Sequence, residues 1–405
     1  MLVVGAGPAG AAAAITAAGA GLETVLVDRA AFPRDKCCGD GLTAAALRLL
    51  DHLGVTPDAP SWRAIDEVEI RSPSGRIARF PLPRGRGQFS AVCRRAELDA
   101  RLVDRARAAG AEVWERAACV GLRQGPGEAT AELAGRGELA ARWVVAADGM
   151  WSPVRRLLTG PGAYRGDWHA FRQYFSGVTG AAARRQLVWF EADLVPGYAW
   201  AFPLGDGSAN VGFGVQRPRG GRRRRGERPV QDMAGLWRSL LERPHIRAAL
   251  GPGAEAEGPH RAWPIPARVA GDALSLGRTL FVGDAARAPD PMTGEGIAQA
   301  LATGVLAAEA IAAGGDVAAR YRRRALAELA ADHRLSAALT APLRSPLGVR
   351  AAVRAAGASD WTRRNFARWL FEDYPRALLL TPGRWRRGVL HADGAYWPPG
   401  FTTTG

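Results

Sequence analysis

Lysine is almost absent from this sequence, because Lys36 is the only lysine among the 54 basic residues. Arginine therefore carries the net charge of +15, and it gathers at 217–228 and around Arg384, Arg386 and Arg387. No recognition motif accompanies this charge, so nucleic acid is not predicted as a partner. The clusters fit a solvated surface, a membrane surface or an anionic substrate. So little lysine beside so much arginine, alanine and glycine is typical of a high-GC genome, and we infer an actinobacterial one.

Cysteine and histidine are also scarce, and their spacing excludes two kinds of site. The four cysteines are Cys37, Cys38, Cys93 and Cys119, and the vicinal pair is poorly placed to form a disulfide. None of the cysteines or of the six histidines has a partner at metal-ligand spacing. The sequence therefore predicts neither a disulfide framework nor a metal site.

Long apolar runs are missing as well, although 47% of the residues are hydrophobic. No stretch of about 18 apolar residues lacks a charge, glycine or proline, so no transmembrane helix is predicted. A glycine-rich loop begins at Gly5, which leaves no room for a secretory signal peptide. We expect a cytoplasmic globular protein, and the basic clusters leave association with a membrane surface as an alternative. Composition does not predict the oligomeric state.

The first 28 residues have the pattern of a dinucleotide-binding βαβ unit. A short apolar strand at 2–4 precedes the loop Gly5-Ala6-Gly7-Pro8-Ala9-Gly10, and an alanine-rich helix and a strand at 24–27 follow. Gly5 permits the tight turn, Gly7 lets the backbone approach a pyrophosphate, and Gly10 lets the helix pack closely on the strand. Asp28, followed by Arg29, ends the second strand, where a carboxylate can bind a ribose hydroxyl.

Two later segments favour FAD over NAD as the dinucleotide. Asp148 follows a buried strand at 143–146, and Asp284 follows another at 279–282. A glycine-rich turn with Gly294 and Gly296 then opens a helix at Ile297. We expect Asp284 to bind the ribityl or pyrophosphate end of a flavin. The helix N–H groups can stabilise negative charge at the N1–C2=O edge of the flavin ring.

The order of predicted elements indicates an α/β fold with a discontinuous FAD-binding Rossmann-like domain. That domain takes the segments 1–64, 91–165 and 273–316. A mixed β-sheet substrate domain is inserted, as a hairpin at 65–90 and a sheet at 166–272, and the segment 317–405 is helical.

These motifs, together with Arg95-Ala96-Glu97-Leu98-Asp99, resemble the flavoprotein family that includes aromatic-ring hydroxylases and geranylgeranyl reductases. The resemblance spans residues 1 to about 310. It implies that Arg95 contacts the flavin and that the backbone of Val120 contacts the adenine. It also places Asp284, Gly296 and Ile297 at the ribityl chain and ring. For Asp148 and Arg155, a structural ion pair remains an equal alternative.

The segment 32–42 points to the reductase branch, since Arg34-Asp35-Lys36-Cys37-Cys38-Gly39 resembles the reductases' Arg-x-Lys-x-Cys-Gly loop. The resemblance places Lys36, Gly39, Asp40 and Gly41 at the flavin, with Cys38 facing the ring and Cys37 as its buried neighbour. Asp40 stands where a second glycine is usual, and such acidic variants look similar to actinobacterial quinone side-chain reductases.

A second segment, Tyr198-Ala199-Trp200-Ala201-Phe202-Pro203 followed by Gly212-Phe213-Gly214, is similar to the prenyl reductases' YxWxFP…GxG signature. On a strand, Tyr198, Trp200 and Phe202 share one face, where they can line the site of a long apolar substrate. An ordinary sheet core is the alternative. Phe171, Tyr174 and Phe175 either line the same cavity or pack in the core.

We therefore expect an FAD-dependent reductase that saturates carbon–carbon double bonds of an isoprenoid or related apolar substrate by hydride transfer from flavin N5. Cys38, and after it Tyr198, are the candidate proton donors. The reductant is NAD(P)H or an external electron donor, because no second glycine loop is present. The alternatives are an FAD-dependent monooxygenase that tailors a polycyclic or terpenoid natural product, and a flavin-binding protein without catalysis.

Overall fold

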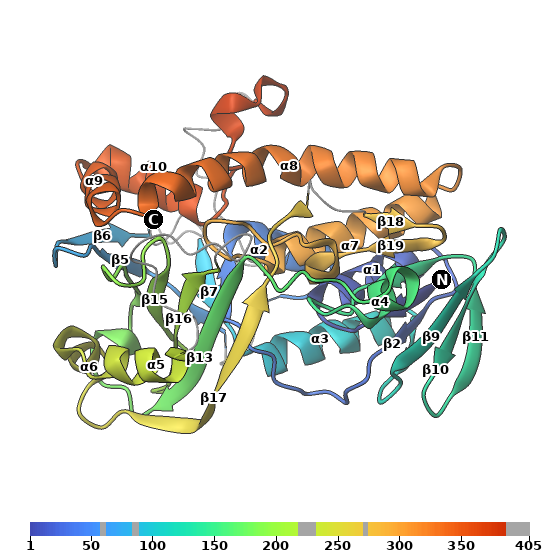
Figure 1. Cartoon of the computed structure of the whole chain (residues 1–405), viewed down its shortest axis with the longest axis horizontal. Helices are drawn as coiled ribbons and strands as arrows, with labels where there is room; N and C mark the ends of the chain where they lie inside the picture. The colour runs from blue at the N-terminus through green and yellow to red at the C-terminus, as the bar shows by residue number, and fades with distance from the viewer. Residues whose placement is uncertain (57–61, 83–88, 218–231, 270–273, 386–405) are drawn as a thin grey trace, which may run out of the picture.

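A six-stranded sheet forms the nucleotide half of the molecule (Figure 1). The computed structural model describes residues 1–56, 62–82, 89–217, 232–269 and 274–385. The strand order is β18 (Ser275–Leu276), β19 (Thr279–Phe281), β12 (Val144–Ala146), β1 (Leu2–Val4), β2 (Val25–Val27), β8 (Glu112–Trp114). All neighbours are parallel except β18 and β19. Strands far apart in the sequence thus build one sheet, as the sequence predicts.

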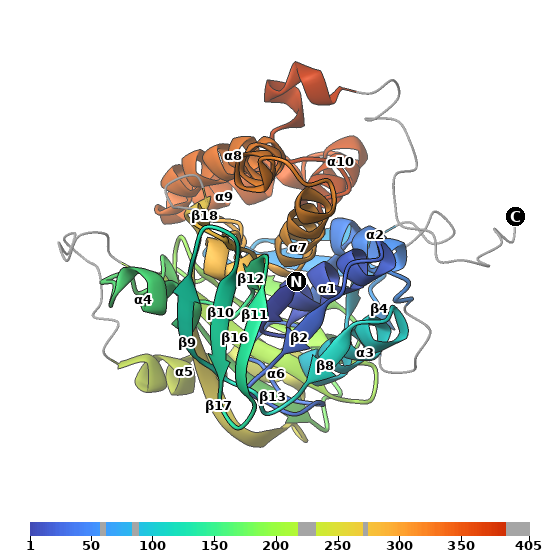
Figure 2. The same cartoon turned by 90° about the vertical axis from the view of Figure 1, so that its right-hand side faces the viewer.

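Helices α1 (Pro8–Gly19) and α3 (Arg95–Ala108) pack on this sheet, and α7 (Ile297–Ala312) packs on α1. Helices α1 and α7 pack against each other, as Figure 2 shows. Both are rich in alanine, and most of these alanine side chains are buried. Such small side chains let the two helix backbones lie close together. The alanine-rich run therefore forms the centre of the largest hydrophobic core.

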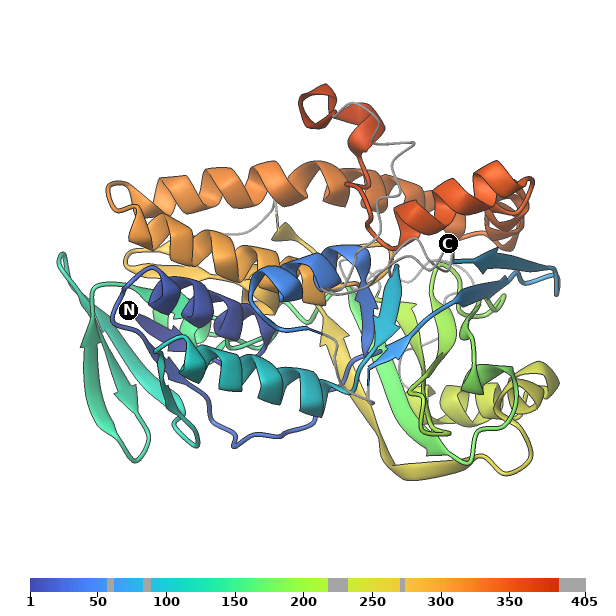
Figure 3. The same ribbon diagram turned by 180° about the vertical axis from the view of Figure 1, so that it is seen from behind.

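A seven-stranded mixed sheet forms the second half (Figure 3). Its order is β17 (Glu255–Ile265), β13 (Trp168–Ser176), β16 (Ala209–Gln216), β15 (Tyr198–Pro203), β14 (Gln186–Trp189), β5 (Glu67–Arg71), β6 (Ile77–Pro81). Only β14 and β5 pair in parallel. The predicted hairpin at 72–75 joins β5 to β6, so the early segment enters this sheet.

Smaller elements complete the two halves. A three-stranded sheet combines β3 (Gly41–Thr43), β7 (Ser90–Val92) and β4 (Arg63–Ala64), and a meander combines β9 (Cys119–Gln124), β10 (Ala129–Leu133) and β11 (Gly137–Ala141). The short helices are α2 (Ala44–His52), α4 (Pro153–Thr159), α5 (Met233–Leu241) and α6 (Pro244–Leu250). The sequence analysis predicted neither the meander nor α5 and α6.

The C-terminal region is helical, as expected, with α8 (Val317–Leu343), α9 (Pro346–Ala356) and α10 (Asp360–Leu370). Helix α8 packs on α7, whereas α9 and α10 pack on β6, so this region spans both halves (Figure 1). Within the described residues, no helix is long and apolar enough to cross a membrane.

Most residues of the two arginine clusters lie outside the part of the chain that the structure describes. Residues 218–231, which hold most of the first cluster, and Arg386 and Arg387 lie outside the described residues. Arg384 is described, and it forms an ion pair with Asp332 at 3.1 Å. The α/β fold with a discontinuous nucleotide domain, an inserted mixed sheet and a helical C-terminal region is confirmed.

Candidate active site

A single continuous cavity of about 1500 Å³ lies between the two halves. A site for one small molecule occupies roughly 300–1,000 Å³, so this cavity has room for a large cofactor and a substrate together. The glycine loop lines one end of it. Side chains of α8, α9 and α10 line the other end.

The glycine loop has no space for side chains at two of its positions. A Cβ atom on Gly5 would lie 2.4 Å from the carbonyl oxygen of Ala147, and Gly5 has a φ of +101°. A Cβ atom on Gly10 would lie 1.8 Å from the carbonyl oxygen of Gly5. These contacts explain why the spacing of the motif is required for the strand, the turn and α1 to pack together.

Two arginine side chains converge above Gly7, where the backbone was predicted to approach a pyrophosphate. The nearest atoms to a Cβ on Gly7 would be Nη2 of Arg34 at 3.7 Å and Nη2 of Arg95 at 3.9 Å. Both guanidinium groups bind the buried carboxylate of Asp99, at 2.6 Å from Arg34 and 2.8 Å from Arg95. An open backbone cradle flanked by two guanidinium groups fits a pyrophosphate. Arg34 was missed as a site residue, although the reductase motif contains it.

Asp28 is buried beside the glycine loop, and it braces that loop. Its carboxylate accepts hydrogen bonds from the backbone N–H of Ala6 and of Ala30, both at 2.8 Å. Each oxygen keeps a second lone pair for a ribose hydroxyl. Asp28, the exposed Arg29 and the buried Ala9 all line the cavity, as expected.

The carboxylate of Asp148 is held by its own loop. It accepts hydrogen bonds from the hydroxyl of Ser152 at 2.7 Å and the N–H of Val154 at 2.8 Å, while burial raises its pKa to about 6. Arg155 donates to the carbonyl of Ala285 at 2.7 Å and lies 3.8 Å from the ring centroid of Phe281. These contacts give both side chains structural partners, and Asp148 also lines the cavity.

Lys36 and the two vicinal cysteines line the cavity. They belong to the segment 32–42, which we call the flavin loop because the sequence predicts that it contacts the flavin. The ammonium of Lys36 lies 3.5 Å from the ring centroid of Trp263, and burial lowers the pKa of Lys36 to about 8. The Cys38 thiol accepts a hydrogen bond from the N–H of Asp40 at 3.4 Å, and burial raises its pKa. Cys37 is partly exposed and donates to the carbonyl of Arg261 at 3.5 Å, so its description as the buried neighbour was wrong.

Asp40 occupies the left-handed backbone region, with φ of +63°, which explains why glycine is usual at this position. Its carboxylate accepts a hydrogen bond from the hydroxyl of Tyr174 at 2.6 Å and from the amide of Asn210 at 2.9 Å. The same amide donates to the carbonyl of Cys38 at 2.8 Å. The Asp40 carboxylate thus bonds to the seven-stranded sheet, while the flavin loop itself lines the cavity.

The aromatic strand β15 lines the cavity with Tyr198, Trp200 and Phe202, as the two-residue period predicts. Their ring centroids are spaced 6.1 and 6.2 Å apart along the strand. A Cβ atom on Gly39 would lie 3.5 Å from Phe202, and one on Gly41 would lie 3.4 Å from it. The flavin loop and the aromatic strand, named separately from the sequence, therefore pack directly on each other.

The turn before α7 brings Asp284, Gly294, Gly296 and Ile297 to the cavity. The sequence predicted free backbone N–H groups at the start of α7, but two of these groups already donate hydrogen bonds within the turn. Glu295 accepts hydrogen bonds at Oε1 from Ile297 at 2.9 Å and from Ala298 at 3.3 Å. Glu295 also lines the cavity, and the sequence analysis assigned it no role.

Some predicted residues lie elsewhere. Val120 is half exposed and outside the cavity lining, whereas Cys119 on the same strand faces the cavity. Phe171 and Phe175 pack around Trp237 in the core of the second sheet, and Tyr174 also lies outside the lining. Among the described residues, no group of His, Cys, Asp and Glu could hold a metal ion.

The apolar end of the cavity was missed from the sequence. Its lining consists of small and apolar side chains from the C-terminal helices: Leu339, Pro342, Leu343, Gly348, Val349, Ala352, Val353, Ala356, Phe366, Trp369 and Leu370. The prediction of a helical region for 317–405 did not place the individual helices, so it could not say which of their faces line the cavity.

Comparison with known proteins agrees with this geometry. A family model described as an FAD binding domain matches residues 1–315. The chain is 33% identical over 337 residues to a menaquinone reductase of Mycolicibacterium smegmatis, covering 78% of this chain and 76% of that protein. It is 30% identical over 321 residues to a digeranylgeranylglycerophospholipid reductase of Methanosarcina acetivorans, covering 76% and 74%. A geranylgeranyl bacteriochlorophyll reductase-like structure from Thermoplasma acidophilum has a TM-score of 0.76 at 23% identity, covering 95% and 98%.

Proposed function

This chain belongs to the FAD-binding-domain family, as an FAD-dependent oxidoreductase of the geranylgeranyl reductase group, and we propose that it saturates carbon–carbon double bonds of an isoprenoid chain. The observation that carries the proposal is the continuity of the cavity. The flavin loop with Cys38, the aromatic strand with Trp200 and the apolar helices α8–α10 all line one space. A long apolar chain can therefore reach the flavin without leaving an apolar surface.

The residues that would hold FAD lie along one wall of the cavity. The glycine loop, Arg34 and Arg95 would bind the pyrophosphate, and Asp28 would bind the adenosine ribose. Asp284 and the turn before α7 would bind the ribityl chain and the pyrimidine edge of the ring. Bound reduced FAD supplies a hydride at N5, whether NAD(P)H or an external electron carrier reduces it.

The chain's own residues position the substrate and exclude water. Tyr198 donates its hydroxyl hydrogen to the carbonyl of Thr293, which fixes the aromatic strand against the turn before α7. Trp200 and Phe202 then offer flat apolar surface beside the flavin loop. Aromatic faces of this kind hold an alkene chain by burial and dispersion without a directional hydrogen bond.

Substrates of the related reductases guide the choice of compound. These relatives are named as reductases of menaquinone and of digeranylgeranylglycerophospholipid, and the second name states that its lipid carries geranylgeranyl chains. The apolar lining from α8–α10 suits such a chain in this protein. We take a lipid of this kind as the substrate class.

Contact with a membrane surface would supply a lipid substrate. Several large apolar side chains of the C-terminal region are 59–71% exposed: Leu347, Trp361, Leu379, Leu380 and Trp385. They belong to the region whose inner side chains line the apolar end of the cavity. Exposed tryptophan and leucine beside arginine are typical of surfaces that insert into the lipid interface.

An anaerobic assay followed by mass spectrometry tests the proposal. The holoenzyme, reduced with dithionite, is incubated with menaquinone or with digeranylgeranylglycerophospholipid, and the products are weighed. The extracted products are exposed to air before the mass is measured, because dithionite also reduces the quinone ring and air returns the quinol to the quinone. A product that is then heavier by two hydrogens for each saturated bond supports reduction of the side chain. A product that forms only in air and is heavier by one oxygen identifies a monooxygenase. Flavin that cycles without any substrate turnover identifies a binding or electron-carrier protein.

A further inference from the structure

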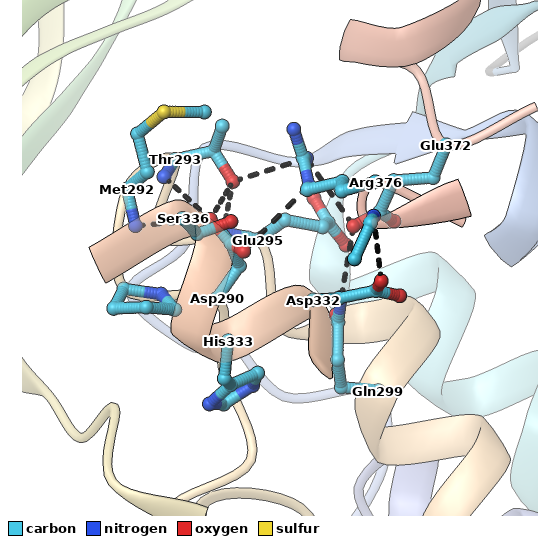
Figure 4. A network of polar contacts seen from close by, with 12 residues as sticks. Asp290, Met292, Thr293, Glu295, Gln299, Asp332, His333, Ser336, Glu372 and Arg376 are labelled. Atoms are coloured by element: carbon cyan, nitrogen blue, oxygen red, sulfur yellow. Dashed lines mark hydrogen bonds and ion pairs between the residues drawn. The ribbon is translucent and has the colours of Figure 1, made fainter. Parts of the chain in front are cut away.

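A buried group of charged side chains lies beneath the turn before α7 (Figure 4). Asp290 and Glu295 come from that turn, whereas Glu372 and Arg376 come from the segment after α10. Nη2 of Arg376 lies 3.2 Å from Glu372, and its Nε lies 3.6 Å from Asp290. Glu295 and Arg376 both line the cavity. Residues from opposite ends of the helical region thus meet at the wall of the proposed flavin site.

Three carboxyl groups in this cluster face one guanidinium. Asp290 is the member suited to carry the negative charge, because it accepts hydrogen bonds from the N–H groups of Met292 at 2.9 Å and Thr293 at 2.8 Å. Although burial opposes its ionisation, the charge of Arg376 and these hydrogen bonds keep the pKa of Asp290 below its usual value. Arg376 thus lies between Asp290 and Glu372, so that Glu295 is the carboxyl group of this cluster that has no ion pair among the described residues.

Glu295 is therefore the member of the cluster best suited to hold a proton. Burial, and then the charge of Glu372, raise the pKa of Glu295 to about 8. Burial likewise raises the pKa of Glu372, which accepts hydrogen bonds from Thr43 at 3.1 Å and Gln299 at 2.9 Å. Three carboxyl groups clustered around one guanidinium do not all ionise at neutral pH.

The two carboxyl oxygens of Glu295 differ in their hydrogen bonds. Within the described part of the chain, both of its hydrogen bonds from Ile297 and Ala298 go to Oε1. Oε2 is therefore the oxygen that can carry the proton. The side chain is partly exposed, and it lines the cavity that would hold flavin and substrate.

The two donors suggested by the sequence are less suited to release a proton. Burial raises the pKa of the Cys38 thiol above its ordinary value, which is already alkaline. The Tyr198 hydroxyl donates to the carbonyl of Thr293, and burial raises its pKa as well. A carboxylic acid that ionises near neutral pH matches the requirement for a general acid better than either group.

We propose that the carboxyl pair Glu295–Glu372 supplies the proton that the reduction consumes, with Glu295 as the acid and Glu372 as its positioning residue. This inference rests on the proposed function. The π bond of the alkene breaks as one carbon takes the hydride from reduced flavin, which is thereby oxidised. The other carbon takes the proton from Oε2 of Glu295. Glu295 is left as a carboxylate and regains a proton through Glu372 from solvent.

The charged and titratable groups that face Glu295 come from every element packed against it, and each enters the interpretation of a pH profile. They are Cys38 of the flavin loop, Tyr198 of β15, Asp290 of the turn, and Glu372 and Arg376 of the C-terminal segment. Removing the charge of Glu372 lowers the pKa of Glu295, whereas removing the thiol of Cys38 leaves the carboxyl pair intact.

The test compares the holoenzymes of wild type, Glu295→Gln, Glu372→Gln and Cys38→Ala. The matched control is Glu309→Gln, at an exposed glutamate of α7 that pairs with Arg324 at 2.6 Å. The flavin absorbance of each oxidised holoenzyme is titrated between pH 5 and 10 without substrate. Wild type, Cys38→Ala and Glu309→Gln are expected to show an inflection near pH 8. Because Lys36 also has a pKa of about 8, every protein is titrated in a Lys36→Met background as well. In that background Glu295→Gln is expected to lack the inflection, and Glu372→Gln to shift it to lower pH.

The same proteins are then reduced and mixed with menaquinone without oxygen in a single turnover, in which saturation of the side chain is measured and not reduction of the quinone ring. We expect the wild-type rate to fall as the pH rises through about 8. We expect Glu295→Gln to be at least about 100-fold slower, while dithionite still reduces its flavin normally. A Glu295→Gln protein with the wild-type rate and pH profile overturns this proposal alone. A wild type that leaves menaquinone and digeranylgeranylglycerophospholipid unreduced overturns the proposed function and this inference together, whatever the substrate-free titration gives.

Discussion

The indole Nε1 of Trp200 donates a hydrogen bond to Oδ1 of Asn210 at 3.0 Å, and both side chains are buried. The amide nitrogen of Asn210 donates in turn to the carbonyl of Cys38 and to the carboxylate of Asp40. One side-chain amide therefore joins the aromatic strand to the flavin loop. The two motifs that identify the reductase branch are thus parts of one hydrogen-bonded unit.

Replacing Asn210 with alanine should destabilise the protein strongly. The substitution leaves the Trp200 N–H, the Cys38 carbonyl and the Asp40 carboxylate short of a partner inside the core. Each such loss costs about 1–3 kcal/mol, so we expect a fall in the free energy of unfolding of about 3–5 kcal/mol by urea denaturation. Asn365→Ala is the control, since this amide bonds only the carbonyl of Trp361 at the surface, and its cost should stay below about 1 kcal/mol. Equal losses in the two variants would contradict the bridging role.

Asp40 should make stability depend on pH. Burial raises its pKa from 3.8 to about 6, so the folded protein keeps a proton that the unfolded chain has already lost. The contribution is therefore fully present below about pH 4, and it is lost as the pH rises through 6. Asp40→Asn removes this loss. Its free energy of unfolding relative to wild type should rise by on the order of 2 kcal/mol between pH 4 and 7. Parallel stability curves for the two proteins would show that Asp40 does not titrate in this range.

Arg34 should contribute to FAD affinity. Its guanidinium lies over Gly7, and a charge-assisted hydrogen bond to phosphate contributes about 1.5–3 kcal/mol. Arg34→Ala should therefore weaken FAD binding about 10- to 100-fold, as measured by quenching of flavin fluorescence on titration of the apoprotein. Arg101→Ala is the control, because Arg101 pairs with Glu97 on the surface of α3. Unchanged affinity in Arg34→Ala would exclude a phosphate contact at this residue.

The apolar end of the cavity should set the length of the accepted chain. Ala356 lines this end, and its exposed neighbour Ala355 does not. Ala356→Trp fills the space beyond the aromatic strand, so long isoprenoid chains should lose kcat/KM about 10-fold or more, while short ones keep it. Ala355→Trp should behave as wild type for both. A uniform loss across chain lengths in Ala356→Trp would place the substrate elsewhere.

The fold was predictable because its signals are local. A dozen residues or fewer are enough to recognise the glycine loop, the alternation in β15 or the alanine-rich helices. Even the discontinuity of the nucleotide sheet follows from an apolar strand that reappears at 279–282 next to an aspartate. Gly39 and Trp200, from the two predicted motifs, both line the cavity. Their loop and strand had been identified correctly from the sequence.

The rest of the site depends on contacts that no local pattern encodes. Glu372 meets Thr43 across 329 positions of sequence, and Asn210 meets Asp40 across 170. A glutamate followed by an aspartate after a surface helix reads as solvated charge until the tertiary packing is known. Glu295 did carry a signal, because it stands inside the glycine turn that opens α7. Only the glycines of this turn were named from the sequence, so the position of Glu295 at the cavity came from the structure.

The position of Glu372 and Arg376 in the chain has a consequence for biosynthesis. The nucleotide sheet is complete once β19 has left the ribosome, and the flavin loop, the aromatic strand and the turn before α7 are all made by residue 297. Glu372 and Arg376 are translated about 75 residues later. A nascent chain can therefore form the residues that would hold FAD before Glu372 and Arg376 are translated. On this order of synthesis, the residues proposed to hold FAD are complete before the proposed acid pair is.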